Sequence, residues 1–177
     1  MEPFRVLTVV GNPRAGSRTS AVADEVARQV VALLGGPEGA EPDSVELGTL
    51  GGELFDRSSA RVAELVGRVS SASVVVVASP VFKATYTALL KAFLEWFDRT
   101  SLRGVVVAPV MVGAAAHHAL AVETYLRPLL VELGGVLPTR GLYVLEDQLD
   151  DLGPTVARWV AESGDAIRRT VLRGSSS

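Results

Sequence analysis

The sequence predicts an α/β fold, in which a parallel sheet lies between two layers of helices. Two observations support this prediction. Short runs of consecutive apolar, β-branched residues recur along the chain, as in strands that are buried on both faces. Between these runs lie stretches with apolar residues at helical spacing. The size fits one domain, because 177 residues of which 48% are apolar can bury about 70% of the surface of the unfolded chain.

Strand and helix patterns alternate from one end of the chain to the other. The first apolar run, 4–10, precedes a helical pattern over 20–34 whose apolar residues share one stripe. A short strand at 44–47 follows a turn rich in glycine and proline and would form the edge of the sheet. The later strands are expected at 74–78, 105–112 and 142–145, and the later helices at 60–69, 85–97, 116–133 and 152–172.

Five strand–helix repeats of this kind form a parallel sheet with right-handed crossovers. Five strands and this chain length favour the flavodoxin-like three-layer sandwich with strand order 2-1-3-4-5 over a larger six-stranded dinucleotide fold. In that order the loops that leave the first, third and fourth strands meet at one crevice, where such folds bind ligands. We see no repeat or second domain and expect a single domain over 1–173, followed by a disordered tail at 174–177.

Composition excludes several classes of function. The chain has no cysteine, which removes disulfides, thiolate metal sites and cysteine nucleophiles. Its 17 Lys and Arg against 20 Asp and Glu give a net charge of −3, so nothing indicates nucleic acid or an anionic membrane as a partner. The N-terminal segment lacks a signal-peptide pattern, and the most apolar run, 104–116, is shorter than the ~20 residues of a membrane span. We therefore expect a cytoplasmic protein.

The first of the three converging loops, 11–20, has the composition of an anion-binding site. Glycines allow the backbone to turn tightly, and hydroxyl groups and arginines at the start of a helix can donate to an anion. The donors are Ser17, Thr19 and Ser20, together with Arg14 and Arg18. The glycine spacing imitates a P-loop, but Ser-Arg stands where Lys followed by Ser or Thr is required, and no G-x-G-x-x-G is present. We predict a cradle for one terminal phosphate, with a plain helix cap as the alternative.

The second loop, 79–87, predicts an apolar surface beside the same crevice. Phe82 and Tyr86 follow a strongly apolar strand, so a flat ligand ring would have aromatic surface to lie on. The alternative is that these two side chains belong to the core or to a subunit contact. The only lysines of the chain, Lys83 and Lys91, lie in this loop and in the helix after it.

The third loop, 112–118, offers backbone groups rather than side chains. Gly113 and the alanines after it let amides approach a ligand closely and donate to carbonyl or anionic oxygens. His117 and His118 are adjacent, so they fall on different sides of a helix and are a poor pair of metal ligands. We expect no metal site, and a structural or capping role for His118. No catalytic triad or carboxylate pair is evident, so we predict no catalytic side chain.

Together the three loops resemble the NADPH-dependent FMN reductase family. The matching stretches are Gly11-Asn-Pro-Arg-x-x-Ser-Arg-Thr19, Ser79-Pro-Val-Phe-Lys-Ala-x-Tyr with Leu90-Lys91 after it, and Gly113 to His118. The likeness extends over 6–145 and is closest to the reductases that supply reduced flavin to alkanesulfonate monooxygenases. It implies a flavodoxin-like fold that binds FMN and takes a hydride from NADPH or NADH. It also implies a homodimer or homotetramer that buries the helix after Lys83.

The resemblance also assigns residues to the flavin. Ser17, Arg18 and Thr19 would hold the phosphate, with Arg14 at its rim. The second loop would flank the ring, and amides of the third loop would face its polar edge. The full set of cofactor-binding residues implied in this way is Asn12, Arg14, Ser17, Arg18, Thr19, Ser20, Pro80, Val81, Phe82, Lys83, Gly113 and Ala114.

The chain departs from the family pattern at three places. Val112-Gly-Ala-Ala115 stands where close relatives have Thr-Gly-Gly-Thr, which removes two hydroxyl groups beside the flavin. In the sulfonate-system reductases a tyrosine interrupts the fourth helix at the position of Thr124, whereas here Tyr125 is the next residue. The resemblance ties this interruption to weak flavin retention and to oligomeric form. Ala88 replaces a glycine at a close helix contact.

The sequence thus leads to three hypotheses about function. The first is an NAD(P)H:FMN oxidoreductase whose reduced flavin passes to a separate monooxygenase, because a chain without its own redox groups suits chemistry done by a cofactor. The second retains FMN and reduces quinones, azo dyes or metal oxyanions. The third is a flavodoxin-type electron carrier without a hydride donor, which the near-balanced charge disfavours because such carriers use strongly acidic surfaces.

Overall fold

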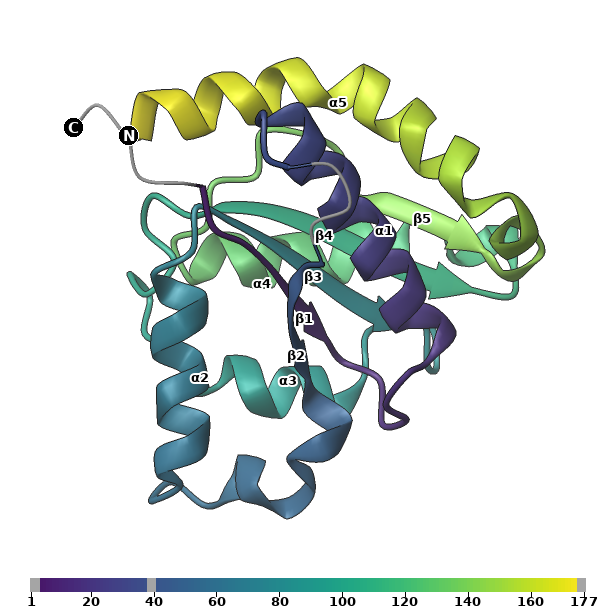
Figure 1. Ribbon diagram of the computed structural model, residues 1–177. Coiled ribbons are helices and arrows are strands. Elements are labelled where there is room, and N and C mark those ends of the chain that lie inside the picture. The colour runs from purple at the N-terminus through teal and green to yellow at the C-terminus, as the bar shows by residue number, and fades with distance from the viewer. Residues whose placement is uncertain (1–3, 38–40, 175–177) are drawn as a thin grey trace.

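The central sheet has five parallel strands in the order β2-β1-β3-β4-β5 (Figure 1). The computed structural model describes residues 4–37 and 41–174. Every residue of the first, third and fourth strands is buried, which explains their largely apolar sequence. The predicted fold class and strand order are confirmed. The strands are β1 (Val6–Val10), β2 (Asp43–Glu46), β3 (Val74–Pro80), β4 (Val106–Gly113) and β5 (Leu142–Leu145).

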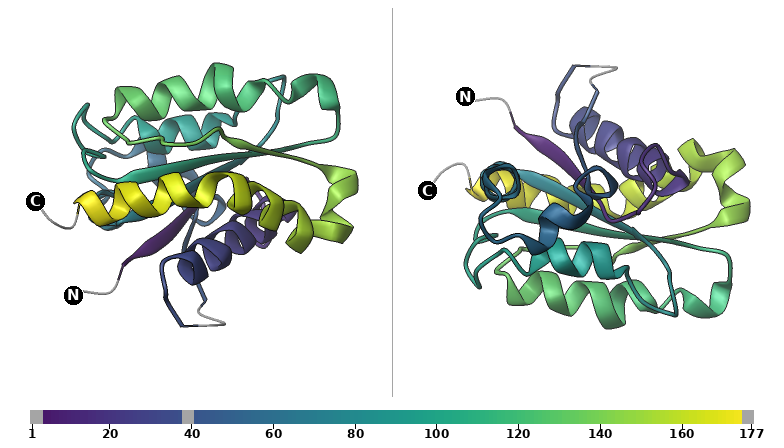
Figure 2. Two further views of the ribbon diagram at one scale, coloured as in Figure 1. Left: turned by 90° about the horizontal axis from the view of Figure 1, so that it is seen from above. Right: turned by 90° about the horizontal axis from the view of Figure 1, so that it is seen from below.

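Helices cover both faces of the sheet, as the two turned views in Figure 2 show. The main helices are α1 (Arg18–Leu33), α2 (Ala60–Ser70), α3 (Ala88–Leu94), α4 (Arg127–Glu132) and α5 (Leu152–Gly174). α1 and α5 pack together on one face, and α2, α3 and α4 cover the other. Short 3-10 helices are η1 (Leu47–Thr49), η2 (Gly51–Phe55), η3 (Ala116–His118) and η5 (Glu146–Asp151).

The third main helix is shorter than the expected span of 85–97. It begins at Ala88 because Thr87 is its N-cap, and the Thr87 hydroxyl oxygen accepts from the amide of Leu90 at 3.1 Å. The residues before Thr87 form a tight hairpin instead of a helical turn. The predicted helix boundary is wrong at both ends for this element, since α3 also stops at Leu94.

The helix predicted over 116–133 is replaced by three shorter elements. η3 comes first, then a π-helix, η4 (Val122–Leu126), and then α4. Pro128 has no amide to donate to the carbonyl of Thr124, so one α-helical hydrogen bond is missing and a change of helical register is favoured here. The π-helix contains Thr124 and Tyr125. The interruption that the resemblance implies is therefore present, although the tyrosine stands one place later.

Two expectations concern the ends and the surroundings of the domain. Gly174, expected in the tail, is the last residue of α5. The rest of that tail, 175–177, lies outside the described residues, and the domain boundary stays a prediction. Among the helices of the described ranges, none is both long and apolar enough to cross a bilayer.

Candidate functional site

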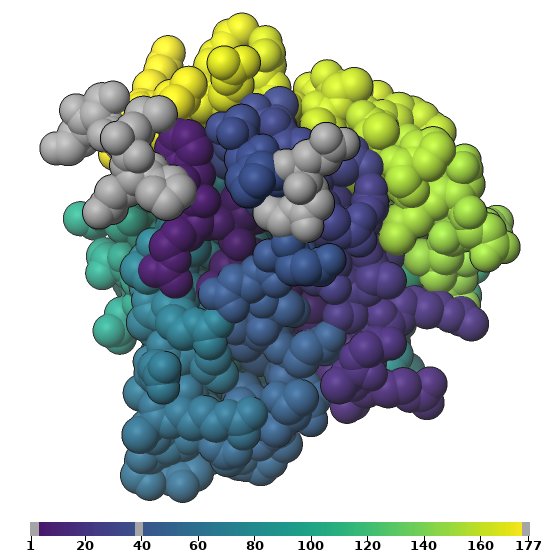
Figure 3. All heavy atoms as spheres, viewed as in Figure 1, coloured from purple at the N-terminus to yellow at the C-terminus, as the bar shows by residue number. Residues whose placement is uncertain are grey.

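A cavity of about 860 Å³ opens at the carboxyl ends of β1, β3 and β4, where this topology binds ligands. It lies beside the loop between β1 and α1, which stands out from the molecular surface in Figure 3 (purple, lower right). Cavities of this size hold cofactor-sized ligands. The predicted flavin-binding residues that line it are Asn12, Arg14, Ser17, Arg18, Thr19, Pro80 and Phe82.

The first loop supplies hydroxyl donors to one wall of the cavity, which we call the cradle (residues 11–19). Ser17 is the N-cap of α1: its hydroxyl oxygen accepts from the amide of Ser20 at 3.2 Å, which leaves its proton to donate. Thr19 is buried, and its oxygen accepts from the side-chain amide of Asn12 at 3.1 Å. Two hydroxyl protons at the start of a 16-residue helix can thus meet an anion. The capping alternative holds for Ser17, but capping uses only its oxygen.

Ser20 supports the cradle from behind and does not line the cavity. Its buried hydroxyl donates to the carboxylate of Glu46, which also accepts from the amide of Gly16 at 3.4 Å. Asp24, one helical turn further along α1, lies near the same carboxylate. Burial, and then the charge of Glu46, raise the pKa of Asp24.

Arg18 is paired with an acidic side chain at the mouth of the cavity. Its Nη1 donates to Oε2 of Glu146 at 3.1 Å, and Glu146, the first residue after β5, also lines the cavity. The side chains are 70% and 47% exposed, so water screens the pair and its net stabilisation is small. An anion in the cradle therefore competes with Glu146 for the guanidinium group.

The second loop forms a two-residue hairpin that presents an aromatic side chain to the cavity. The amide of Phe82 donates to the carbonyl of Thr85 at 2.8 Å, and the amide of Thr85 donates back at 3.2 Å. Between them Lys83 and Ala84 have φ angles of 53° and 66°, a left-handed conformation that costs an L-residue about 1–2 kcal/mol. Phe82 is 50% exposed and lines the cavity, whereas Lys83 and Val81 do not. Strain of this kind is typical of functional loops.

Contacts of α3 hold the second loop against the first. Thr87 Oγ1 donates to the carbonyl of Gly11 at 2.6 Å, and the Thr87 amide donates to the hydroxyl of Ser79 at 3.1 Å. A Cβ at Gly11 would lie 2.6 Å from the Cβ of Leu90, so only glycine permits this approach. These buried contacts fix the aromatic hairpin relative to the cradle.

The third loop contributes Val112 to the cavity lining, whereas Gly113 and Ala114 do not line it. Val112 accepts through its carbonyl from the amide of Val81 at 2.8 Å, which joins the second and third loops. Within residues 4–37 and 41–174, no hydrogen-bond acceptor is found for the amide of Ala114. This amide is therefore available to a ligand.

The two histidines lie in η3 and do not line the cavity. Their rings meet edge to face, with centroids 4.1 Å apart. The amide of His118 donates to the carbonyl of Ala115 at 3.1 Å, which closes the first turn of η3. The described part of the chain contains no group of three or more His, Asp or Glu side chains that could hold a metal ion.

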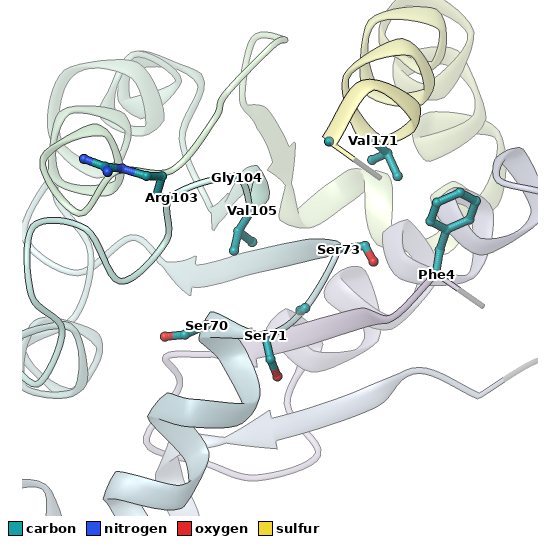
Figure 4. Close-up of a pocket in the computed structure, with 10 residues that line it drawn as sticks. Phe4, Ser70, Ser71, Ser73, Arg103, Gly104, Val105 and Val171 are labelled. Carbon is teal, nitrogen blue, oxygen red and sulfur yellow. The ribbon is translucent and has the colours of Figure 1, made fainter. Parts of the chain in front are cut away.

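A second cavity, of about 310 Å³, lies at the opposite end of the strands (Figure 4). Phe4, Ser73 and Val171 line it, and the charged end of Arg103 points away from them. The segments around it lead into β1, β3 and β4, so it lies at the amino ends of the strands. Ligands of this fold bind at the other end.

Fold and cavity together define a class of protein. A doubly wound five-stranded sheet, with an anion cradle and an aromatic side chain at its switch point, is typical of flavodoxin-like proteins that bind a mononucleotide. The family model for NADPH-dependent FMN reductase matches residues 4–150. The chain therefore belongs to the NADPH-dependent FMN reductase family, and its predicted resemblance is confirmed.

Individual relatives agree with this assignment. The chain is 32% identical over 149 residues to the NADH-dependent FMN reductase SfnF of Pseudomonas putida, covering 83% of this chain and 80% of the relative. It is 29% identical over 151 residues to the FMN reductase (NADPH) of Escherichia coli (strain K12), covering 84% and 76%. The solved structure of the NADH:FMN oxidoreductase EMOB in its apo form superimposes with a TM-score of 0.74 at 25% identity, covering 96% of this chain and 89% of that one.

Sequence reasoning misses several residues that line the cavity. These are Pro13, Gly16, Val112 and Glu146. Pro13 and Gly16 lie within the predicted cradle loop, but neither has a hydrogen-bonding side chain. Glu146 could have been found from its position directly after an apolar strand, because all carboxyl ends of a parallel sheet lie along one edge.

Proposed function

We propose that the chain transfers a hydride from NADPH or NADH to FMN and releases the reduced flavin for use by a separate monooxygenase. Family membership supports the reductase activity. The observation that carries the proposal is the 860 Å³ cavity, which is lined both by hydroxyl and guanidinium donors and by an exposed aromatic ring. Such a cavity matches a ligand with a phosphate at one end and a flat ring at the other.

The residues of the cavity fit a flavin mononucleotide. Ser17, Thr19 and Arg18 offer donors to a terminal phosphate, including one charge-assisted hydrogen bond. Phe82 offers aromatic surface to an isoalloxazine ring. The amide of Ala114, which has no acceptor among the described residues, offers a donor to the polar edge of that ring.

The bound flavin supplies the redox chemistry, because it accepts a hydride from the nicotinamide. The residues of the chain bind and orient. The cradle would hold and neutralise the phosphate, while Phe82 would exclude water from the surface that it covers. Amides after Gly113 would donate to the polar edge of the ring.

Release of the flavin is the finer part of the proposal, and three features support it. The cradle is open to solvent, since the side chain of Arg18 is 70% exposed. Glu146 competes with the phosphate for that arginine. The π-helix η4 matches the helix interruption that the resemblance ties to weak flavin retention. A cytoplasmic location belongs to this proposal, because the nicotinamide donor is a cytoplasmic metabolite.

We also infer a homo-oligomer. Leu120, Tyr125 and Val131 are 73%, 49% and 54% exposed along the segment from η3 to α4. Apolar side chains gathered on one exposed segment favour burial against another subunit. Size-exclusion chromatography with light scattering should give a dimer or tetramer mass, and a monomer would contradict this inference.

The test of the function is binding and turnover with purified protein. Fluorescence titration should show saturable FMN binding, and oxidation of NADPH or NADH should require added FMN with sequential kinetics. Arg18→Ala should weaken both. Arg169→Ala is the matched control, because Arg169 is 73% exposed and ion-paired with Asp165 on α5, far along the chain from the cradle.

Three other outcomes would contradict the proposal or part of it. No flavin binding under any condition would refute it entirely. FMN that stays bound through purification, with ping-pong transfer to a quinone, would contradict release and favour the FMN-retaining reductase. Reversible reduction of bound flavin without any oxidation of NADPH or NADH would favour the electron carrier.

A further inference from the structure

A tyrosine on β5 holds the loop that is expected to face the polar edge of the flavin ring. Tyr143 pairs in register with Met111 of β4, and its ring packs on the apolar cluster beneath α3 and α4. The Tyr143 hydroxyl donates to the carbonyl of Ala115 at 2.7 Å. Burial raises the pKa of Tyr143, so the hydroxyl keeps its proton at neutral pH.

Gly113 leaves open the space that this hydroxyl occupies. A Cβ at position 113 would overlap the hydroxyl oxygen of Tyr143 and would lie 3.1 Å from its Cζ atom and 3.3 Å from a methyl carbon of Val81. Any side chain larger than hydrogen would therefore displace the phenol or the loop. The glycine and the tyrosine are a matched pair of residues from adjacent strands.

The hydrogen bond of Tyr143 fixes the orientation of one peptide group. The carbonyl of Ala115 accepts both from Tyr143 and from the amide of His118, at 2.7 and 3.1 Å. In a trans peptide the N–H points opposite to the C=O, so the amide of Ala116 points away from Tyr143. The amide of Ala114, two residues before that of Ala116, has no acceptor in the described ranges.

We propose that Tyr143 is a positioning residue for the flavin ring, because its hydroxyl holds the carbonyl of Ala115 and so orients the amides of residues 113–116 before the ligand arrives. The inference rests on the proposed function, since it takes FMN as the ligand. Groups that are oriented in advance bind more tightly because less freedom is lost on binding. The phosphate is held by the cradle on the other wall, so Tyr143 should affect the ring and not the phosphate.

Tyr143→Phe tests this inference, because it removes the hydroxyl and keeps the ring. Three probes separate the two ends of the ligand: FMN, riboflavin, which has no phosphate, and inorganic phosphate as a competitor of FMN. FMN and riboflavin should both bind about three- to tenfold more weakly, the effect of one lost hydrogen bond. The inhibition constant of phosphate as a competitor of FMN should not change. The visible absorption spectrum of the flavin at saturation should also shift, since hydrogen bonds at the polar edge are altered.

Thr170→Val is the matched control. Thr170 Oγ1 donates to the carbonyl of Ala166 at 2.7 Å within α5, so the control deletes a hydroxyl bond of the same length at a remote site. It should leave all three affinities and the flavin spectrum unchanged. A spectrum or a riboflavin affinity that moves as much in this variant as in Tyr143→Phe would overturn the positioning role.

Gly113→Ala provides a second route to the same contact, in case Tyr143→Phe does not fold. It keeps the hydroxyl but places a methyl group where the hydroxyl lies, so it should give the same ring-selective loss. The double variant should have about the same flavin affinity as the single variant that binds flavin more weakly, because the two substitutions act on one contact.

The remaining outcomes separate this inference from the function on which it rests. Unchanged riboflavin binding in Tyr143→Phe, while the wild type binds FMN, would overturn the positioning role and leave the FMN reductase standing. Equal losses for riboflavin and phosphate would mean a general loss of structure and would also overturn it. A wild-type chain that binds no flavin would refute the proposed function and this inference with it.

Discussion

The two walls of the cavity are built in different ways. The cradle consists of polar side chains close together in sequence, at the start of one helix, and its left-handed residue is a glycine, Gly16. The rest of the lining comes from the aromatic hairpin with its two strained L-residues and from Val112, and the backbone amides that follow Val112 do not themselves line the cavity. The orientation of those amides depends on Tyr143, which lies 28 residues beyond the carbonyl that it holds.

This difference predicts which ligands a substitution should affect. Changes in the cradle should weaken ligands that carry a phosphate and leave riboflavin untouched. Changes in the opposite wall should weaken FMN and riboflavin equally and leave phosphate binding untouched. The first three substitutions below test that division, and the last two test the stability of the segments that form the site.

The largest effect is expected for Arg18→Ala. FMN binding should weaken by about 1.5–3 kcal/mol, the range for a hydrogen bond to a charged group, while riboflavin binding stays the same. Fluorescence titration of both flavins measures this, with Arg169→Ala as the control. An unchanged FMN dissociation constant would remove Arg18 from the phosphate site.

Phe82→Ala should weaken the binding of the ring at the other end of the ligand. The aromatic side chain is half exposed, so its loss should cost little stability but should weaken FMN and riboflavin each by about 1 kcal/mol, the scale of an aromatic pair. The same titrations apply. A loss confined to FMN would contradict the division between the two walls.

Glu146→Gln should strengthen FMN binding. The substitution removes the carboxylate that competes for Arg18, and the gain should be about 0.5–1 kcal/mol, the size of an exposed ion pair. The gain should shrink as salt is added, because salt screens the pair in the wild type. Weaker FMN binding would mean that Glu146 contacts the ligand favourably.

Ala84→Gly tests the strain in the aromatic hairpin. Relief of a left-handed L-residue, reduced by the greater freedom of glycine in the unfolded chain, should raise the free energy of unfolding by about 0.5 kcal/mol. Chemical denaturation measures this change. Ala63→Gly, within α2, is the control and should be destabilising by about 1 kcal/mol.

The smallest effect is expected for Asp24→Asn, behind the cradle. Because burial raises the pKa of Asp24 above its ordinary value of 3.8, ionisation of Asp24 disfavours the folded state. The penalty should be absent below the ordinary value, grow as pH rises through the folded pKa, and be complete at neutral pH. Asp24→Asn should therefore raise stability at pH 7 and lose that advantage in acid, as denaturation at both pH values would show.

The sequence predicts the sheet well because its signal is local. The buried runs in β1, β3 and β4 are largely apolar, with Thr8 and Ser79 as their polar exceptions. The predicted helix boundaries are wrong where a single polar residue or a proline decides them. Thr87 caps α3, so this helix begins later than predicted, and Pro128 interrupts the segment that apolar spacing alone extends over 116–133.

The same distinction between local and distant sequence signals applies to the residues of the site. Ser17, Arg18 and Thr19 could be predicted because glycine, hydroxyl and arginine residues before a helix carry their meaning in a few adjacent positions. Glu146 and Tyr143 could not, since each acts through a partner far away in sequence. The position of Ser20 was also out of reach, because its hydroxyl turns toward Glu46 of β2 and not toward the cavity.

The central claim is that FMN lies in this cavity with its phosphate in the cradle and its ring against the opposite wall. A crystal structure of the chain with FMN tests it most directly. The claim predicts phosphate oxygens within hydrogen-bond distance of Ser17, Arg18 and Thr19, the ring against Phe82, and its polar edge at the amides after Gly113. A flavin bound outside the cavity, or bound in it with the phosphate at Phe82, would contradict the claim.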